Sequence, residues 1–302
     1  MSTRGAAHSQ RRTSGRRFAV LAVAALVGLV GLGACGKGNP KPSVKDITTY
    51  VALGDSYTAV SGAGPFTDTT CLRSDTDYPA LVAKRLSIPG FENVSCGGAT
   101  SDNLTQRQFP ATGTGSNPPQ LDALTHDTTL VTLGIGGNDF DLGSALYPCL
   151  SPGGRTTAAC AKYLNQSSSG ISASISKVGV QVAANIRSVR KAAPGARIIL
   201  VGYPRVLADD TDCPDQVPVP AEAAQRIRET GTMMNDTLRS AARRTHVDFI
   251  DMYAASEGHD VCSASPWVNG QRAVPGQALP FHPYVAYHEA VADKIVALLS
   301  KK

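Results

Sequence analysis

Short apolar runs alternate with longer amphipathic stretches along most of this chain. The short runs have the character of buried strands, at residues 50–53, 130–133, 198–201 and 247–250, with a weaker one at 91–94. The longer stretches have helical character, at residues 78–86, 171–193, 221–244 and 283–299. This alternation predicts an α/β fold: a single three-layer domain, with a central parallel sheet of about five strands and helices on both faces. No internal repeat interrupts it, so we expect one domain over residues 46–302.

The first 34 residues are typical of a secretory signal that is removed from the mature protein. They contain five arginines and no acidic residue, followed by an apolar run at residues 18–30. That run is shorter than the about 20 apolar residues of a transmembrane helix. The ending Leu-Gly-Ala-Cys at 32–35 resembles a bacterial lipobox, which implies cleavage before Cys35 and a diacylglycerol on its sulfur. An ordinary signal with an incidental cysteine is the alternative, and the Arg16-Arg17 doublet leaves general and twin-arginine export open.

Residues 35–45 are rich in Gly, Pro and Lys and indicate a tether between the lipid and the domain. The protein is therefore expected outside the cell, anchored to the membrane or released from it. The arginines of the signal account for the whole excess of 29 basic over 24 acidic residues. A neutral mature domain argues against nucleic acid as a partner. Nothing in the sequence indicates a metal or other cofactor, and the oligomeric state is left open.

Six cysteines follow Cys35, and an even number in an exported chain predicts disulfides. They are Cys71, Cys96, Cys149, Cys160, Cys213 and Cys262. A zinc site would need close pairs such as C-x-x-C, and the sequence has none. Of the possible connectivities we predict pairing between neighbours, most firmly Cys149–Cys160 because a short segment with Pro and Gly separates them. Cys71–Cys96 and Cys213–Cys262 then follow.

Gly54-Asp55-Ser56 directly follows the first predicted strand. Open parallel sheets bind ligands beyond the carboxyl ends of their strands. A serine there lies at a strand-to-helix turn, where the start of a helix favours developing negative charge. Ser56 is therefore a candidate nucleophile, although a serine that only caps a helix would account for the same residues.

Two glycine-containing segments are candidates for an oxyanion hole. Gly-Gly-Asn-Asp at residues 136–139 follows a strand, and the amide of Asn138 could donate to a tetrahedral oxyanion. Residues 96–100 follow the weaker strand, and the N–H of Gly98 could supply another donor. Taken alone, each segment is equally well explained as a turn, the second beside a disulfide.

His282 is the histidine best placed for catalysis. Pro283 biases it toward extended geometry and so holds it at the end of a loop. His288 lies inside the last predicted helix, and its spacing from His282 is not that of a helical metal site, so we predict a structural role. The others lie in the signal, in polar stretches or near a cysteine: His8, His126, His246 and His259.

Taken together and in this order, these segments resemble the SGNH (GDSL-like) hydrolase superfamily, whose four motifs carry Ser, Gly, Asn and His. The matching residues are Ser56, Gly98, Asn138 and His282. Gly-Asp-Ser-Tyr-Thr-Ala at residues 54–59 and the six later cysteines are especially similar to secreted actinobacterial lipases and esterases. The resemblance covers residues 50–298.

The resemblance implies an SGNH, flavodoxin-like fold and a serine carboxylester hydrolase, a lipase or esterase that acts on small-molecule or lipid esters. Ser56 would attack the ester carbonyl, and His282 would take and later return the proton. The N–H groups of Ser56 and Gly98 and the side chain of Asn138 would bind the oxyanion.

Two positions depart from the family. The usual aspartate three residues before the histidine is Leu279 here. Some members of this branch use a main-chain carbonyl instead, which implies a Ser–His dyad with the Leu279 carbonyl orienting the imidazole. Asp251 and Asp260 remain rivals because they follow the last strand. Val60 replaces the usual glycine after Thr-Ala, so the resemblance does not imply the shape of the substrate pocket near it.

Two other functions remain as alternatives. One is a carbohydrate deacetylase, which would use the same residues on another ester. The other is a catalytically dead lipoprotein that binds lipid or glycan, but a dead enzyme would be expected to lack the serine, asparagine or histidine, and all are present. An α/β-hydrolase is disfavoured because the sequence has no G-x-S-x-G turn.

Overall fold

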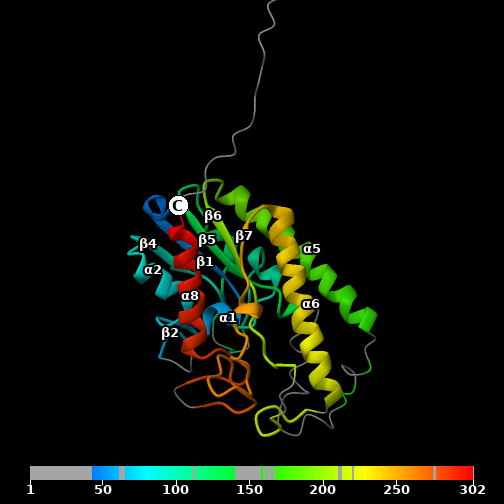
Figure 1. Ribbon diagram of the computed structural model, residues 1–302. Coiled ribbons are helices and arrows are strands. Elements are labelled where there is room, and N and C mark those ends of the chain that lie inside the picture. The colour runs from blue at the N-terminus through cyan, green and yellow to red at the C-terminus, as the bar shows by residue number, and fades with distance from the viewer. Residues whose placement is uncertain are drawn as a thin grey trace, which may run out of the picture. The chain divides into compact units, whose positions relative to one another are not determined.

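A five-stranded parallel sheet forms the centre of the computed structural model (Figure 1). The structure describes residues 43–60, 65–110, 112–113, 115–139, 158, 161, 165, 168–209, 213–219, 221–274 and 277–301. The strands are β1 (Thr49–Gly54), β4 (Gly90–Asn93), β5 (Leu130–Gly134), β6 (Arg197–Val201) and β7 (Asp248–Ile250). Their order across the sheet is β4-β1-β5-β6-β7, and every pairing is parallel. All five predicted strands are confirmed.

Helices cover both faces of the sheet, as the α/β prediction requires. Alternate residues of one strand serve the two faces. Val51 and Leu53 of β1 pack in the core formed with α5 (Ser168–Ala192) and α6 (Ala221–Thr245). Tyr50 and Ala52 pack in the core formed with α2 (Tyr78–Arg85) and α8 (Val285–Ser300).

The predicted helices are present, with one correction at the start of the last helix. α8 begins at Val285, not at Pro283, because Pro283 forms an isolated bridge with Val268 and is extended. The start of α2 follows the expected chemistry of a helix N-terminus. The carboxylate of Asp77 accepts the N–H of Ala80 at 2.9 Å, and a proline occupies the first turn.

Several short elements were not predicted. They are the hairpin of β2 (Phe66–Asp68) and β3 (Arg73–Ser74), the helices α1 (Ser56–Ala59) and α7 (Met252–Ala255), and the 3-10 turns η1 (Val44–Asp46), η2 (Ser101–Leu104) and η3 (Gln120–Ala123). Each is too short to show a period in the sequence. Within the ranges described above, no helix is long and apolar enough to cross a bilayer.

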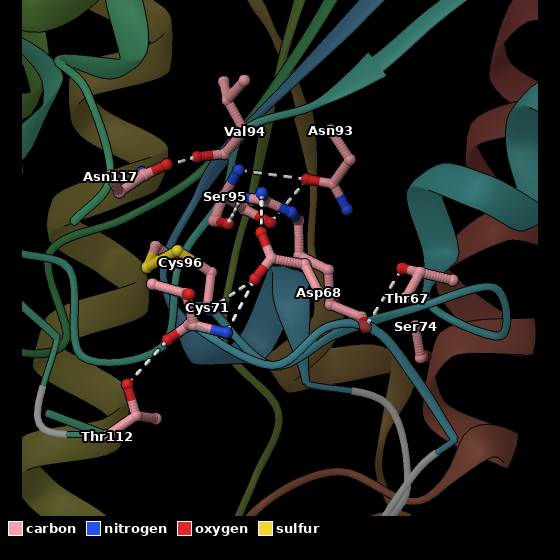
Figure 2. Close-up of polar contacts among 12 residues, drawn as sticks. Thr67, Asp68, Cys71, Ser74, Asn93, Val94, Ser95, Cys96, Thr112 and Asn117 are labelled. Carbon is pink, nitrogen blue, oxygen red and sulfur yellow. Dashed lines mark hydrogen bonds and ion pairs between the residues drawn. A yellow bond between two sulfur atoms is a disulfide. The ribbon is translucent and has the colours of Figure 1, made fainter. Parts of the chain in front are cut away.

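Two of the predicted disulfides are confirmed. Cys71–Cys96 joins the β2–β3 hairpin to the segment after β4 (Figure 2), and Cys213–Cys262 joins the segment before α6 to the loop after α7. The predicted pair Cys149–Cys160, the signal and Cys35 lie outside the described residues.

The sheet brings three candidate segments to one edge. Ser56 follows β1, Gly98 follows β4, and Asn138 follows β5, and these strands are parallel neighbours with β1 in the middle. Because the carboxyl ends of parallel strands meet at the same edge, the three segments lie next to one another.

Candidate active site

Ser56 is the first residue of α1, and only Asp55 separates it from the end of β1. The turn requires glycine at Gly54, where φ is +155° and a Cβ atom would lie 2.6 Å from the carbonyl oxygen of Gly134. The buried amide of Gln120 binds both polar main-chain groups of Gly54. Its Oε1 accepts the N–H at 2.8 Å, and its Nε2 donates to the carbonyl at 2.9 Å. One side chain therefore holds both the N–H and the carbonyl of Gly54, at the start of the turn that carries Ser56.

The carboxylate of Asp55 connects this turn to the segment after β5. It accepts the N–H of Tyr57 at 2.9 Å and the hydroxyl of Tyr203. The oxygen of Tyr203 in turn accepts the N–H of Gly137 at 2.7 Å. Burial raises the pKa of Asp55 to about 7, against the effect of these hydrogen bonds. One tyrosine hydroxyl thus joins two of the sequence motifs.

Asn138 lies in the turn after β5, and its amide is held in one orientation. Its Nδ2 donates to the carbonyl oxygen of Ala99 at 2.9 Å. An amide has two N–H groups, and the second one of Asn138 has no partner among the described residues. The next residue, Asp139, is buried and accepts the N–H and the hydroxyl of Ser101, so it supports the turn.

Gly98 lies in the segment after β4 with φ at +75°, a conformation that favours glycine. The N–H of Cys96, two residues earlier, donates to the carbonyl of Gly54 at 3.0 Å and so ties the segment to the Ser56 turn. Neither the N–H of Gly98 nor that of Ser56 has a hydrogen-bond partner in the described part of the chain. Three N–H groups on linked segments, including the second one of Asn138, are therefore free to bind an anion.

His282 lies at the end of the loop before α8, as predicted, and it is half-buried. Its Nδ1 lies 2.8 Å from the carbonyl oxygen of Pro280, which must accept, so Nδ1 carries the proton. This corrects the expectation of Leu279. The Leu279 carbonyl instead accepts the main-chain N–H of His282 at 3.2 Å and the amide of Asn269 at 3.1 Å. Burial lowers the pKa of His282 below its usual value, and the bond to Pro280 opposes that effect.

Tyr57 links the serine and histidine segments. Its ring stacks on the imidazole of His282, with centroids 5.9 Å apart and planes inclined by 26°. Its hydroxyl donates to the carbonyl oxygen of Phe281 at 2.7 Å. The residue after Ser56 thus contacts both His282 and the residue before it.

Neither rival carboxylate contacts the imidazole. Asp251 caps α7 by accepting the N–H of Ala254 at 3.0 Å, and it pairs with Arg239. Asp260 is buried and accepts the N–H of Cys262 at 3.0 Å. In the described residues, the Pro280 carbonyl is the hydrogen-bond partner of the His282 ring.

His288 has the structural role predicted for it. It is fully buried in α8, where its Nδ1 accepts the N–H of Tyr78 at 3.1 Å and its Nε2 donates to the carbonyl of Val60 at 3.0 Å. Both ring nitrogens are used, and burial lowers the pKa of His288 to about 4.

No hydrogen bond joins Ser56 to His282 within the described residues. Catalytic hydrogen bonds are often long in unliganded enzymes and shorten when substrate binds. The structure shows the surrounding arrangement: a serine at a fixed turn, and, among the residues it describes, three N–H groups and the Nε2 of His282 without a hydrogen-bond partner.

Comparison with known proteins agrees with this arrangement. The GDSL-like Lipase/Acylhydrolase family profile matches residues 52–290. The chain belongs to this family. Lipase 2 of Streptomyces coelicolor is 31% identical, over 94% of this chain and 97% of that protein. The structure is similar to phospholipase A1 from Streptomyces albidoflavus, with a TM-score of 0.68, 26% identity, and coverage of 83% of this chain and 99% of that one. It is equally similar to the extracellular lipase of Streptomyces rimosus, with a TM-score of 0.68, 25% identity and the same coverage.

Membership of the GDSL-like family and similarity to these lipases identify the chain as a carboxylic ester hydrolase that acts on small-molecule esters. They also support the secreted actinobacterial branch that the sequence motifs indicated.

A small apolar pocket lies beside the Asn138 turn of this hydrolase. Its volume is about 130 Å³, and Gly137 and Tyr203 form part of its wall. The rest of the wall comes from the loop after β6, from α6 and from Tyr253 of α7, and it includes Leu207, Ile227 and Met234. The tyrosine that binds Asp55 and Gly137 therefore also lines an apolar cavity.

Sequence reasoning missed the residues that hold these segments in place. Tyr57, Tyr203, Gln108 and Gln120 each make a polar contact to a motif segment from a distant part of the chain. Tyr57 adjoins Ser56 in sequence and could have been suspected from that position. The others are single polar residues in loops or a 3-10 turn, without spacing or periodicity to mark them.

Proposed function

We propose that this protein cleaves acyl esters with Ser56 as nucleophile and His282 as general base and acid, working as a dyad. The proposed oxyanion hole consists of the N–H groups of Ser56 and Gly98 and the side-chain amide of Asn138. The observation that carries the proposal is that these three N–H groups are unpartnered among the described residues, while their segments are tied together. Ser56 is buried and Asn138 is half-buried, whereas Gly98 is exposed. Buried N–H groups are normally paired, and a binding site for negative charge explains why those of Ser56 and Asn138 are left without a partner in the described part of the chain.

The reaction proceeds in two halves. Ser56 Oγ attacks the ester carbonyl carbon while its proton passes to Nε2 of His282, and the negative charge develops on the former carbonyl oxygen. The intermediate then collapses, the C–O bond to the alcohol breaks, and His282 returns the proton to the leaving alcohol. In the second half, water gives a proton to His282 and attacks the acyl carbon. The bond from that carbon to Ser56 Oγ then breaks and His282 gives the proton to Oγ, which releases the acid and restores Ser56.

The Pro280 carbonyl supports this role of His282 without a carboxylate. Its contact with Nδ1 fixes the tautomer in which Nε2 has a free lone pair. Because the pKa of His282 is lowered, the ring is neutral at neutral pH and can accept a proton. A neutral carbonyl stabilises the imidazolium less than a carboxylate would, because a charge-assisted hydrogen bond is about twice as strong.

We further propose that the apolar pocket beside Gly137 takes the acyl chain. A pocket of about 130 Å³ is small, and its lining by Leu207, Ile227 and Met234 favours an alkyl chain over a sugar. The activity of purified protein on p-nitrophenyl esters of rising chain length tests this. We expect short acyl chains to be preferred, and a preference for acetylated carbohydrate over all of them would favour the deacetylase alternative.

Labelling with a fluorophosphonate tests the nucleophile. The reagent should add to Ser56, as shown by peptide mass spectrometry, and the label should be absent from the Ser56→Ala variant. Labelling of another serine in the wild type would contradict the assignment.

We further propose a secretory signal at residues 1–34, a lipid on Cys35, a tether to residue 45 and the hydrolase domain at residues 46–302. Two disulfides in the described residues support an oxidising compartment. Labelling cells with a palmitate analogue tests the anchor. Wild type should incorporate it and Cys35→Ser should not, whereas an unlabelled wild type would leave an ordinary signal as the explanation.

A further inference from the structure

The segment that leads from β4 to Gly98 is held one peptide unit at a time. The carbonyl of Val94 accepts the side-chain amide of Asn117 at 3.1 Å (Figure 2), and the N–H of Ser95 donates to the side chain of Asn93 at 3.0 Å. The carbonyl of Ser95 accepts the guanidinium of Arg73 at 2.9 Å. Side chains from the β2–β3 hairpin and from the loop near residue 117 therefore fix the start of the segment.

The next units are fixed by main-chain groups. The N–H of Cys96 donates to Gly54 and that of Gly97 donates to Cys71, both at 3.0 Å. The carbonyl of Cys96 accepts the N–H of Ala99 at 3.1 Å. Every peptide unit from Val94 to Gly97 is thus held at both its carbonyl and its N–H end.

The last unit joins the carbonyl of Gly97 to the N–H of Gly98, and among the described residues only its carbonyl end has a hydrogen-bond partner. Nε2 of Gln108 donates to the Gly97 carbonyl at 2.8 Å. A trans peptide is planar, with its C=O and N–H pointing in opposite directions. A side chain that fixes the Gly97 carbonyl therefore also sets the direction of the Gly98 N–H. Two successive glycines would otherwise allow this unit to rotate.

Gln108 is itself rigidly placed. Its main-chain N–H and carbonyl both pair with those of Asn117 at 2.9 Å, and its side chain is buried. The Oε1 of Gln108 is buried without a hydrogen-bond partner among the described residues. A buried oxygen without a hydrogen-bond partner destabilises a fold. The hydrogen bond from Nε2 to the Gly97 carbonyl is therefore what accounts for a glutamine at position 108.

We infer that Gln108 is a positioning residue for the oxyanion hole, acting through the Gly97–Gly98 peptide. The inference rests on the proposed function, because it assigns to the Gly98 N–H the role of an oxyanion donor. Gln108 contacts neither substrate nor nucleophile in this account. It aims one N–H group at the place where the charge develops.

Gln108→Met tests the inference, because methionine keeps the length of the side chain and removes the donor. Loss of a preorganised donor costs about 100–1,000-fold in kcat, and misdirection of one should cost part of that, about 10–100-fold. KM should change by less than about threefold, since the oxyanion forms only in the transition state. An alkyl boronic acid, which forms a tetrahedral adduct with a serine nucleophile, should bind more weakly by the same factor as the loss in kcat/KM.

Gln271→Met is the matched control. Gln271 is also a buried glutamine whose Nε2 donates to a main-chain carbonyl, that of Asp215 at 3.0 Å, and its Oε1 also lacks a partner among the described residues. Its loss should lower the melting temperature while kcat and boronate affinity stay within about threefold of wild type. A merely structural role for Gln108 would give this same result.

Gln108→Asn provides a second variant if Gln108→Met does not fold, since its shorter amide cannot reach the Gly97 carbonyl. A folded Gln108 variant with kcat and boronate affinity within about threefold of wild type would overturn the inference. The proposed function is tested separately. If Ser56→Ala and Asn138→Ala were both fully active, the assigned site itself would be wrong. If those two variants lost activity and the folded Gln108 variants did not, only the positioning role would be rejected.

Discussion

The hydroxyl of Tyr57 donates a hydrogen bond to the carbonyl oxygen of Phe281 across 2.7 Å, and the same ring stacks on His282. Phe281 has φ of +54°, which is unfavourable for a residue with a side chain. The bond therefore helps to hold an unfavourable backbone conformation immediately before His282, the proposed base.

Tyr57→Phe should accordingly lower kcat while KM changes little. The ring and its stacking on His282 are retained, and only the hydrogen bond is lost. Such a bond is worth about 0.5–1.5 kcal/mol, so a decrease in kcat of about 2- to 10-fold is expected. Tyr50→Phe is the control, because the hydroxyl of Tyr50 makes a buried contact with Thr132 at 2.7 Å and not with the loop that carries His282. Equal losses of kcat in the two variants would show that Tyr57 has no special role.

Asn138→Ala should lower kcat by about 100–1,000-fold, as expected when one oxyanion donor is removed. The fold should persist, since the side chain makes one hydrogen bond within the described residues, to the carbonyl of Ala99. Steady-state kinetics with circular dichroism as a check on folding measures both. A loss below about threefold would mean that Asn138 is only a turn residue.

Asp251→Asn and Asp260→Asn should each keep kcat within about tenfold of wild type, because neither carboxylate contacts His282 in the structure. When a triad aspartate becomes asparagine, turnover can fall about 10⁴-fold. A collapse of that size in either variant would replace the dyad with a triad and name its acid.

The titration of His282 provides an independent test of the dyad. Burial lowers its pKa below 6.5, so the neutral ring that can accept a proton should persist to pH values below 6.5. Activity should therefore be lost only as the pH falls through this lowered pKa. Proton NMR, with the His282 signal assigned by its absence from His282→Gln, measures the value directly. A pKa above 6.5 would indicate a carboxylate next to the ring, since a nearby negative charge favours the imidazolium.

The sequence was most informative where burial restricts a segment to apolar residue types. The strands at Leu130–Gly134 and Arg197–Val201 are buried on both faces and appear as short, mostly apolar runs. The strand Gly90–Asn93 gave a weak signal because it lies at the edge of the sheet, with Phe91 and Glu92 exposed.

The catalytic candidates could be predicted because their spacing follows the strands, but their supports could not. Whether the carbonyl of Leu279 or of Pro280 meets the imidazole depends on the φ of Phe281, which no sequence rule specified. Gln108 reaches Gly97 from a loop eleven residues further along the chain, through a contact between single residues. Such contacts depend on how the loops fold back, and residue types alone do not encode them.

The central claim is that Ser56 is the nucleophile, and hydrolysis of p-nitrophenyl butyrate by purified wild type and Ser56→Ala tests it most directly. Removal of the nucleophile of a serine hydrolase can cost about 10⁶-fold in kcat. The Ser56→Ala protein should therefore show no measurable turnover, with a circular-dichroism spectrum like that of wild type. A folded Ser56→Ala protein with wild-type activity would contradict the account.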